Sequence, residues 1–137
     1  MKSRTLLPFL LAIGFQTSQT FPQASEQKPK VDITLAPKCG DGADSQGNIE
    51  GTVTGLQSPE NYKIVLYAHT DKWYVQPLGD SPLTEIGADG KWSNWTHLGG
   101  RYAALVVPAS FSAPADTLAL PTIKQGVIAN AEVSCKE

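Results

Sequence analysis

Apolar and polar residues alternate in short runs along most of this chain, a pattern typical of β-strands with one buried face. The runs at 31–35, 49–56 and 127–133 alternate in this way. Residues 62–69 have large side chains at both odd and even positions, so both faces of a strand there would be bulky. They are also rich in aromatic and β-branched residues, which predicts a central strand. Further strands are expected at 73–76, 83–86, 91–96 and 102–107.

Turn-forming residues separate these runs at short intervals. Residues 40–48 are dense in Gly, Asp and Ser, and Asp89-Gly90 is a strong β-hairpin signal. Residues 108–126 contain three prolines and form an unusually long connection, which we expect to contain a short strand or to be an exposed functional loop. Seven or eight short strands at this spacing predict an all-β, antiparallel sandwich of the immunoglobulin-like or fibronectin-III-like kind.

The first apolar run, residues 6–15, differs from the expected strands because it follows Lys2 and Arg4 and precedes a polar stretch. About ten apolar residues are too few to cross a bilayer, which needs about twenty, but they fit the apolar region of a signal peptide. We expect a signal peptide at 1–24, a flexible lead-in at 25–30 and one β-sandwich domain at 31–137. The alternative for the apolar run is a buried strand. Export predicts a secreted or periplasmic protein without membrane insertion after cleavage.

The charge and the cysteine content of the chain bear on its partners and on the compartment in which it folds. The chain has 11 basic residues, of which Lys2 and Arg4 belong to the expected signal peptide, so 9 remain against 13 acidic ones. This balance argues against nucleic acid as a partner, since nucleic-acid binding needs basic patches. Two cysteines in an oxidising compartment predict a disulfide between Cys39 and Cys135. Free or metal-binding thiols are the alternative.

Aromatic and polar residues gather between positions 69 and 102. Sugar-binding sites place an aromatic face against the sugar ring and polar side chains against its hydroxyls. Strand alternation sets Trp73 and Tyr74 on opposite faces and does the same for Trp92 and Trp95, of which Trp95 is the better exposed candidate. The alternative for each aromatic is a place in the core. The candidate ligand-binding residues are His69, Asp71, Trp73, Tyr74, Gln76, Trp95 and Tyr102.

The segment Ala88-Asp89-Gly90-Lys91-Trp92-Ser93 resembles the D-G-x-W-S turn and strand of many bacterial exported immunoglobulin-like domains. Residues 51–107 are also similar to β-sandwich domains of bacterial secreted proteins, some of which are appended to carbohydrate-active enzymes. In such domains the tryptophan after the turn packs in the core, which the resemblance implies for Trp92. These domains share no single function, so the resemblance implies a fold rather than an activity.

Catalytic and metal-binding patterns are absent from the sequence. It contains no G-x-S-x-G motif, and His69, His97 and Asp71 do not complete the ligand set of a metal site. We therefore expect no enzyme activity, no cofactor and no metal. The expected function is that of a structural or protein-interaction module, with exposed strand edges or residues 108–126 as the contact. The alternative is a carbohydrate-binding or cell-surface binding module, so the expected partner is a protein or a polysaccharide.

Overall fold

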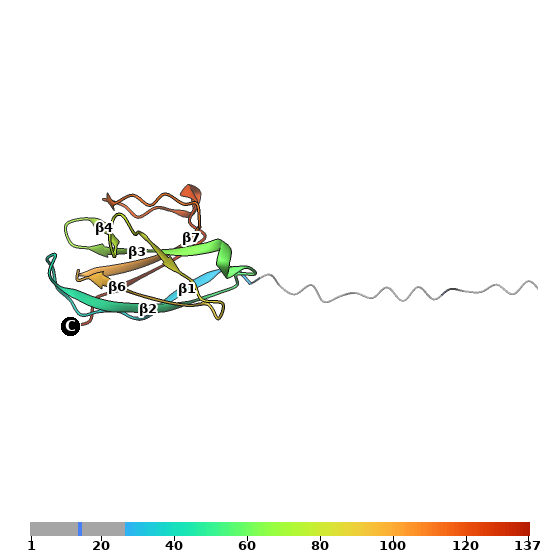
Figure 1. Cartoon of the computed structure of the whole chain (residues 1–137), viewed down its shortest axis with the longest axis horizontal. Helices are drawn as coiled ribbons and strands as arrows, with labels where there is room; N and C mark the ends of the chain where they lie inside the picture. The colour runs from blue at the N-terminus through green and yellow to red at the C-terminus, as the bar shows by residue number, and fades with distance from the viewer. Residues whose placement is uncertain (1–13, 15–26) are drawn as a thin grey trace, which may run out of the picture.

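The computed structural model describes residue 14 and residues 27–137, so the expected signal peptide, apart from residue 14, and the first two residues of the expected lead-in lie outside the described residues. Strands dominate the described part of the chain (Figure 1). They are β1 (Lys30–Leu35), β2 (Gln46–Thr54), β3 (Tyr62–His69), β4 (Trp73–Gln76), β5 (Leu83–Glu85), β6 (Lys91–His97), β7 (Arg101–Pro108), β8 (Asp116–Thr117) and β9 (Ala129–Ser134). Two 3-10 turns, η1 (Pro59–Asn61) and η2 (Ile123–Gln125), complete the elements.

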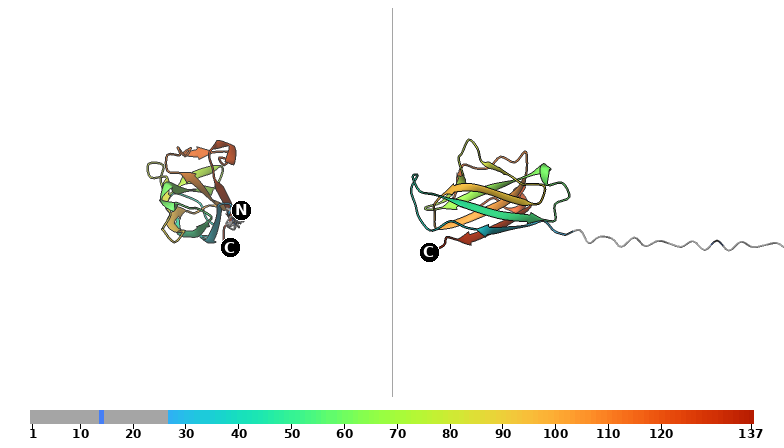
Figure 2. Two further views of the ribbon diagram at one scale, coloured as in Figure 1. Left: turned by 90° about the vertical axis from the view of Figure 1, so that its right-hand side faces the viewer. Right: turned by 60° about the horizontal axis from the view of Figure 1, so that its bottom comes forward.

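The strands form two antiparallel sheets that pack face to face (Figure 2). The smaller sheet has the order β1-β2-β6, and the larger has the order β8-β4-β3-β7-β9, with β5 paired to one end of β3. The predicted all-β antiparallel sandwich is therefore confirmed. Each of the eight expected strands is present within the described residues, and β8 adds a short one inside the long connection at 108–126.

β3 is the central strand of the larger sheet, as its residue pattern predicts, and it pairs with β4, β5 and β7. Its residues Ile64 to Ala68 are all buried. Ile64 and Leu66 face the smaller sheet and belong to the inner core, whereas Val65 and Tyr67 belong to a second core on the opposite face. A strand with both faces covered accounts for the bulk that the sequence shows on both faces.

The inner core lies between the two sheets and contains Trp92, which is 3% exposed. Its indole lies against the backbone of Gly51, its cross-strand partner in β2. A side chain on Gly51 would overlap the ring, so the absence of a Cβ atom makes room for the tryptophan. The core position that the resemblance implies for Trp92 is confirmed.

The second core lies on the outer face of the larger sheet, beneath residues 108–126, which we call the covering segment. Phe111 and Leu120 of this segment pack against the buried side chains of the sheet. The Tyr67 hydroxyl donates a hydrogen bond to the Pro114 carbonyl at 2.9 Å, and the Val75 N–H donates to the Ala115 carbonyl at 2.9 Å. The long connection is therefore a third layer that holds a short strand.

The two ends of the domain are joined by the predicted disulfide between Cys39 and Cys135, which lie 96 positions apart in the sequence. β1 and β9 lie side by side next to it (Figure 2). The buried Tyr102 hydroxyl donates to the Lys38 carbonyl at 2.9 Å and accepts from the Gly99 N–H at 2.9 Å. A disulfide in this place indicates an oxidising extracellular or periplasmic setting. In the part of the chain that the structure describes, no helix is long and apolar enough to cross a membrane.

Candidate functional site

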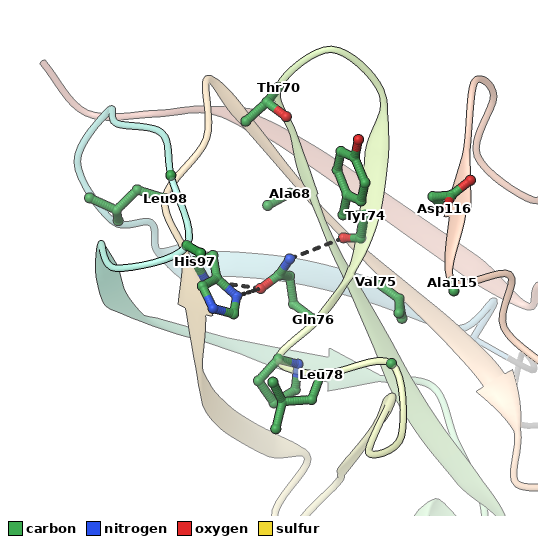
Figure 3. Close-up of a pocket in the computed structure, with 14 residues that line it drawn as sticks. Ala68, Thr70, Tyr74, Val75, Gln76, Leu78, His97, Leu98, Ala115 and Asp116 are labelled. Carbon is green, nitrogen blue, oxygen red and sulfur yellow. Dashed lines mark hydrogen bonds between the residues drawn. The ribbon is translucent and has the colours of Figure 1, made fainter.

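The larger sheet extends beyond the edge of the smaller one. β6 is the edge strand of the smaller sheet and packs against β3 and β4, while β8 continues the larger sheet past β4. Part of the inner face of β4 is therefore left open. Tyr74 and Gln76 point to this face, because Trp73 and Val75 point to the second core, and they line a groove of about 530 Å³ (Figure 3).

Several pieces of the chain surround this groove, which we call the β4 groove. Its other walls come from the end of β3 and Thr70 after it, the end of β6, the loops at 42–43 and 77–79, and the start of β8 (Figure 3). Apolar side chains form much of its surface, with a few polar groups among them, as in many small-molecule sites. The residues that line it include Ala68, Thr70, Tyr74, Gln76, Leu78, His97 and Asp116.

A hydrogen-bonded contact between Gln76 and His97 joins the two sheets at the groove (Figure 3). Gln76 is 4% exposed, and its Oε1 atom accepts from the His97 backbone N–H at 2.9 Å. The same oxygen lies 2.9 Å from Nδ1 of the His97 ring. Because the Gln76 oxygen can only accept, this contact is a hydrogen bond when Nδ1 of His97 carries a proton.

Trp95 lies two residues before His97 and shares its face of β6. The two rings meet edge to face, with centroids 5.2 Å apart. Trp92 belongs to the inner core, so Trp95 is on the outer face of the smaller sheet, where it is partly exposed. The predicted opposite orientation of the two tryptophans is confirmed. The exposed side chains of Gln46, Asn48 and Glu50 stand beside Trp95 on the neighbouring strand β2.

A second hollow, of about 730 Å³, lies further along β6, and we call it the β5 hollow. It is lined by residues of β2, β5 and β6, including Glu50, Thr84 and Ser93. Along β6, residues 91–94 line the β5 hollow and His97 lines the β4 groove. Trp95 therefore stands between two hollows on a single strand.

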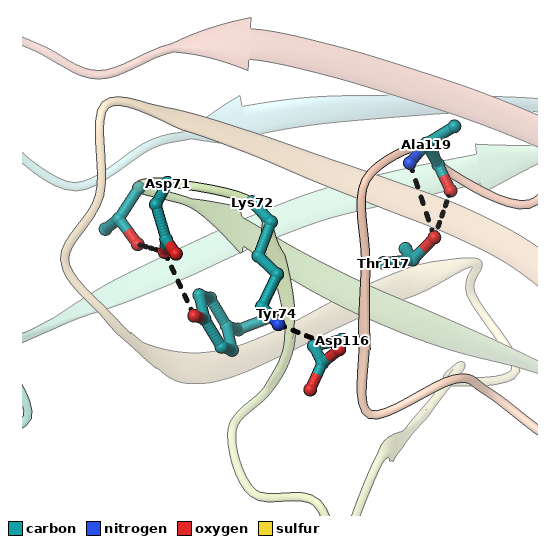
Figure 4. A network of polar contacts seen from close by, with 7 residues as sticks. Asp71, Lys72, Tyr74, Asp116, Thr117 and Ala119 are labelled. Atoms are coloured by element: carbon teal, nitrogen blue, oxygen red, sulfur yellow. Dashed lines mark hydrogen bonds and ion pairs between the residues drawn. The ribbon is translucent and has the colours of Figure 1, made fainter.

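Polar contacts fix the position of Tyr74 at the rim of the β4 groove (Figure 4). The Tyr74 hydroxyl donates to Oδ1 of Asp71 at 2.9 Å, and Lys72 forms an ion pair with Asp116 at 3.2 Å. The hydrogen bond from Tyr74 lowers the pKa of Asp71, and the same bond raises the pKa of Tyr74. These groups are exposed, so the contacts orient the ring more than they stabilise the fold.

The structure separates the predicted candidates into two groups. Tyr74 and Gln76 line the β4 groove, and Asp71 reaches it through Tyr74. Trp73 is 5% exposed and belongs to the second core, so it lies away from the groove. Its ring lies 4.9 Å from the ring of His69 and 5.5 Å from the guanidinium carbon of Arg101.

Neither Tyr102 nor His69 lines the β4 groove. Tyr102 is 0% exposed, and its hydroxyl is taken up by backbone groups. His69 lies beside Trp73, on the face of the larger sheet opposite the groove. The sequence pattern does not predict the contact between His97 and Gln76. These residues lie 21 positions apart and meet only because the two sheets pack together. The alternation from Trp95 to His97 was the available signal for their shared face.

In the described residues, no group of three or more His, Cys, Asp or Glu side chains gathers in a way that would hold a metal ion. Comparisons with protein-family models, with curated proteins and with solved structures found no match for this chain.

Proposed function

We propose that this domain is an exported, non-catalytic module that binds a carbohydrate through Trp95 and the polar side chains beside it. The observation that carries the proposal is a partly exposed tryptophan on an open sheet face, flanked by Asn48, Gln46 and His97. A sugar offers an apolar ring face to an aromatic side chain and hydroxyls to amide and imidazole groups. This arrangement suits such a ligand better than an apolar one.

β6 forms the free edge of the smaller sheet, where a partner protein could add a strand. The hydrogen bonds along this edge favour ligand binding over such strand addition. An added strand needs backbone N–H groups that are free to pair. Three N–H groups of β6 are already bonded to side chains. Lys91 donates to Asp89 at 3.0 Å, Trp95 donates to Asn94 at 2.8 Å and His97 donates to Gln76 at 2.9 Å.

The second candidate function is a protein contact at the covering segment, which retains the expected role as an interaction module. Leu118 is 85% exposed and Ile123 is 71% exposed, both on this segment. Large apolar side chains at the surface mark protein contacts when they form a patch. Loss of a co-purifying protein from a Leu118→Ser, Ile123→Ser variant would favour this function, and a monomer without partners in the unaltered protein would count against it.

The strand order also supports a finer assignment of the fold as fibronectin-III-like or immunoglobulin-like. The order β1-β2-β6 corresponds to strands A-B-E of those sandwiches, and β3-β7-β9 corresponds to C-F-G. Tyr102 at the start of β7 bonds back to Gly99, as the tyrosine at the corner before strand F does in such domains. The disulfide departs from the antibody pattern, because it joins the two chain ends instead of bridging strands B and F.

Affinity electrophoresis in gels that contain soluble polysaccharides tests the proposed function. The unaltered domain is expected to be retarded by at least one polysaccharide, and Trp95→Ala is expected to migrate as in a gel without it. Leu118→Ala is the matched control, because it removes an exposed apolar side chain outside the site and should be retarded like the unaltered domain. Equal retardation of the unaltered domain and Trp95→Ala would overturn the role of Trp95.

A further inference from the structure

We propose that the carbohydrate site continues from Trp95 over His97 into the β4 groove, so that its ligand is an extended chain of neutral sugar units. This inference rests on the proposed function and adds a second subsite and a ligand class to it. The β4 groove is separate from the sheet face that presents Trp95, because Trp95 does not line the groove.

Continuity between the two subsites comes from His97. Its ring meets the ring of Trp95 at 5.2 Å and lies 2.9 Å from the Gln76 oxygen in the groove. His97 also lines the groove itself. Because Gln76 is buried and bonds both the backbone and the ring of His97, the corner between the subsites is held in place before any ligand arrives.

The groove has the size and chemistry of a sugar subsite. Its volume of about 530 Å³ lies within the range of ordinary ligand pockets, about 300–1,000 Å³. Tyr74 supplies an aromatic side chain and Thr70 a hydroxyl. Leu78, 45% exposed, provides an apolar side chain at the surface of the groove. A pocket that combines one aromatic ring with a few polar groups fits a ring that carries several hydroxyls.

The charges around the site select a neutral chain. Among the described residues that line the β4 groove, none is Lys or Arg, and Asp116 is acidic. Lys72, next to the groove, is already paired with Asp116 at 3.2 Å. Glu50 adds a further acidic group near Trp95. Within the β4 groove, an anionic chain would meet the carboxylate of Asp116 and no lysine or arginine in the lining to bond its carboxylates or sulfates.

Gly79 offers a way to block the groove alone. It lines the β4 groove, a Cβ atom at this position would meet nothing within 4 Å, and its backbone conformation is open to other residues. Gly79→Trp is therefore expected to fold normally and to fill the groove without touching Trp95. Ser110→Trp, at an exposed position of the covering segment, is the matched control for adding an indole to the surface. Thermal melting of both variants checks the fold.

Isothermal titration with neutral cello-, manno- and xylo-oligosaccharides of one to six units tests the inference, with oligogalacturonides as the anionic probe. Affinity of the unaltered domain should rise at least about tenfold from two units to six in one neutral series, because only the longer chain fills both subsites. Gly79→Trp should lose that gain and keep the affinity for the shorter chain. Ser110→Trp should match the unaltered domain, and oligogalacturonides should bind more weakly.

The outcomes separate the two proposals. Binding that depends on Trp95 but does not increase with chain length, or that Gly79→Trp leaves unchanged, would overturn the second subsite and leave the proposed function standing. Tighter binding of oligogalacturonides than of every neutral series would overturn the neutral ligand class. Absence of binding to all four series at millimolar concentration would contradict the proposed function itself.

Discussion

Trp92 and Trp95 belong to the same strand and have opposite surroundings. An odd number of positions separates them, so they occupy opposite faces of β6. Trp92 fills the inner core against Gly51, whereas Trp95 lies among polar side chains on the outer face. Their different surroundings therefore follow from strand geometry, and the alternation of the sequence predicts that they face opposite sides of the sheet.

Gly51→Ala should destabilise the domain by about 3 kcal/mol or more, because the new methyl group would overlap both the Trp92 ring and the Asp32 carbonyl. Neither neighbour is the free end of a flexible side chain. Urea unfolding followed by tryptophan fluorescence measures the change in the free energy of unfolding. Gly79→Ala is the matched control and should unfold within about 1 kcal/mol of the unaltered domain, since its Cβ atom meets open space. Equal midpoints for the two variants would contradict the close contact at Gly51.

At the scale of elements, most strands could be located from the sequence, whereas in the covering segment the sequence predicts only a short strand or an exposed loop and not where the strand lies. Alternation and turn residues locate β3, β4, β6 and β7 to within about a residue or two. β2 begins at Gln46, inside a stretch that is as polar as a loop, because β6 pairs with it there. The two residues of β8 lie among prolines and are held by β4 and Tyr67, which are distant in the sequence, so no local pattern indicates them.

Tyr67 links the covering segment to the larger sheet and should make stability depend on pH in the alkaline range. Burial raises the pKa of Tyr67 from 10.0 to about 12. The unfolded chain therefore releases this proton at lower pH than the folded one, so stability is complete below about pH 10 and is lost as the pH rises toward about 12.

Urea unfolding between pH 8 and pH 12 measures this dependence. Burial also raises the pKa of Tyr102, so the comparison with Tyr67→Phe isolates the contribution of Tyr67. The variant should be less stable at pH 8, because it loses the hydrogen bond to Pro114, and its stability should fall less steeply above pH 10. Parallel curves for the two proteins would show that Tyr67 titrates in the folded state as it does in the unfolded chain.

At the level of the whole molecule, the sequence predicts the β-sandwich and the disulfide between its ends better than it predicts the candidate binding site. The two cysteines predict the disulfide, and the strand patterns predict the all-β fold. The candidate site depends on how far the larger sheet extends past β6, which is a property of packing between sheets. For this reason the pattern identifies Tyr74, Gln76 and Trp95 but does not show that His97 connects them.

The disulfide closes a loop of almost the entire domain, so its loss should cost about 4–5 kcal/mol through the greater freedom of the unfolded chain. A Cys39→Ser, Cys135→Ser variant should melt well below the unaltered domain in differential scanning calorimetry. Reduction of the unaltered protein should give the same lowered melting temperature. An unchanged melting curve, or free thiols in the unaltered protein by mass spectrometry, would contradict this role.

NMR of the three tryptophan indole N–H groups shows whether Trp95 contacts a carbohydrate. Labelled domain is titrated with cellohexaose, mannohexaose and xylohexaose, and Trp95→Phe assigns the signal. We expect one of these chains to shift the indole signal of Trp95, while the signals of the buried Trp73 and Trp92 stay in place. An unmoved Trp95 signal with all three chains, or shifts confined to residues around Leu118 and Ile123, would contradict carbohydrate binding by Trp95.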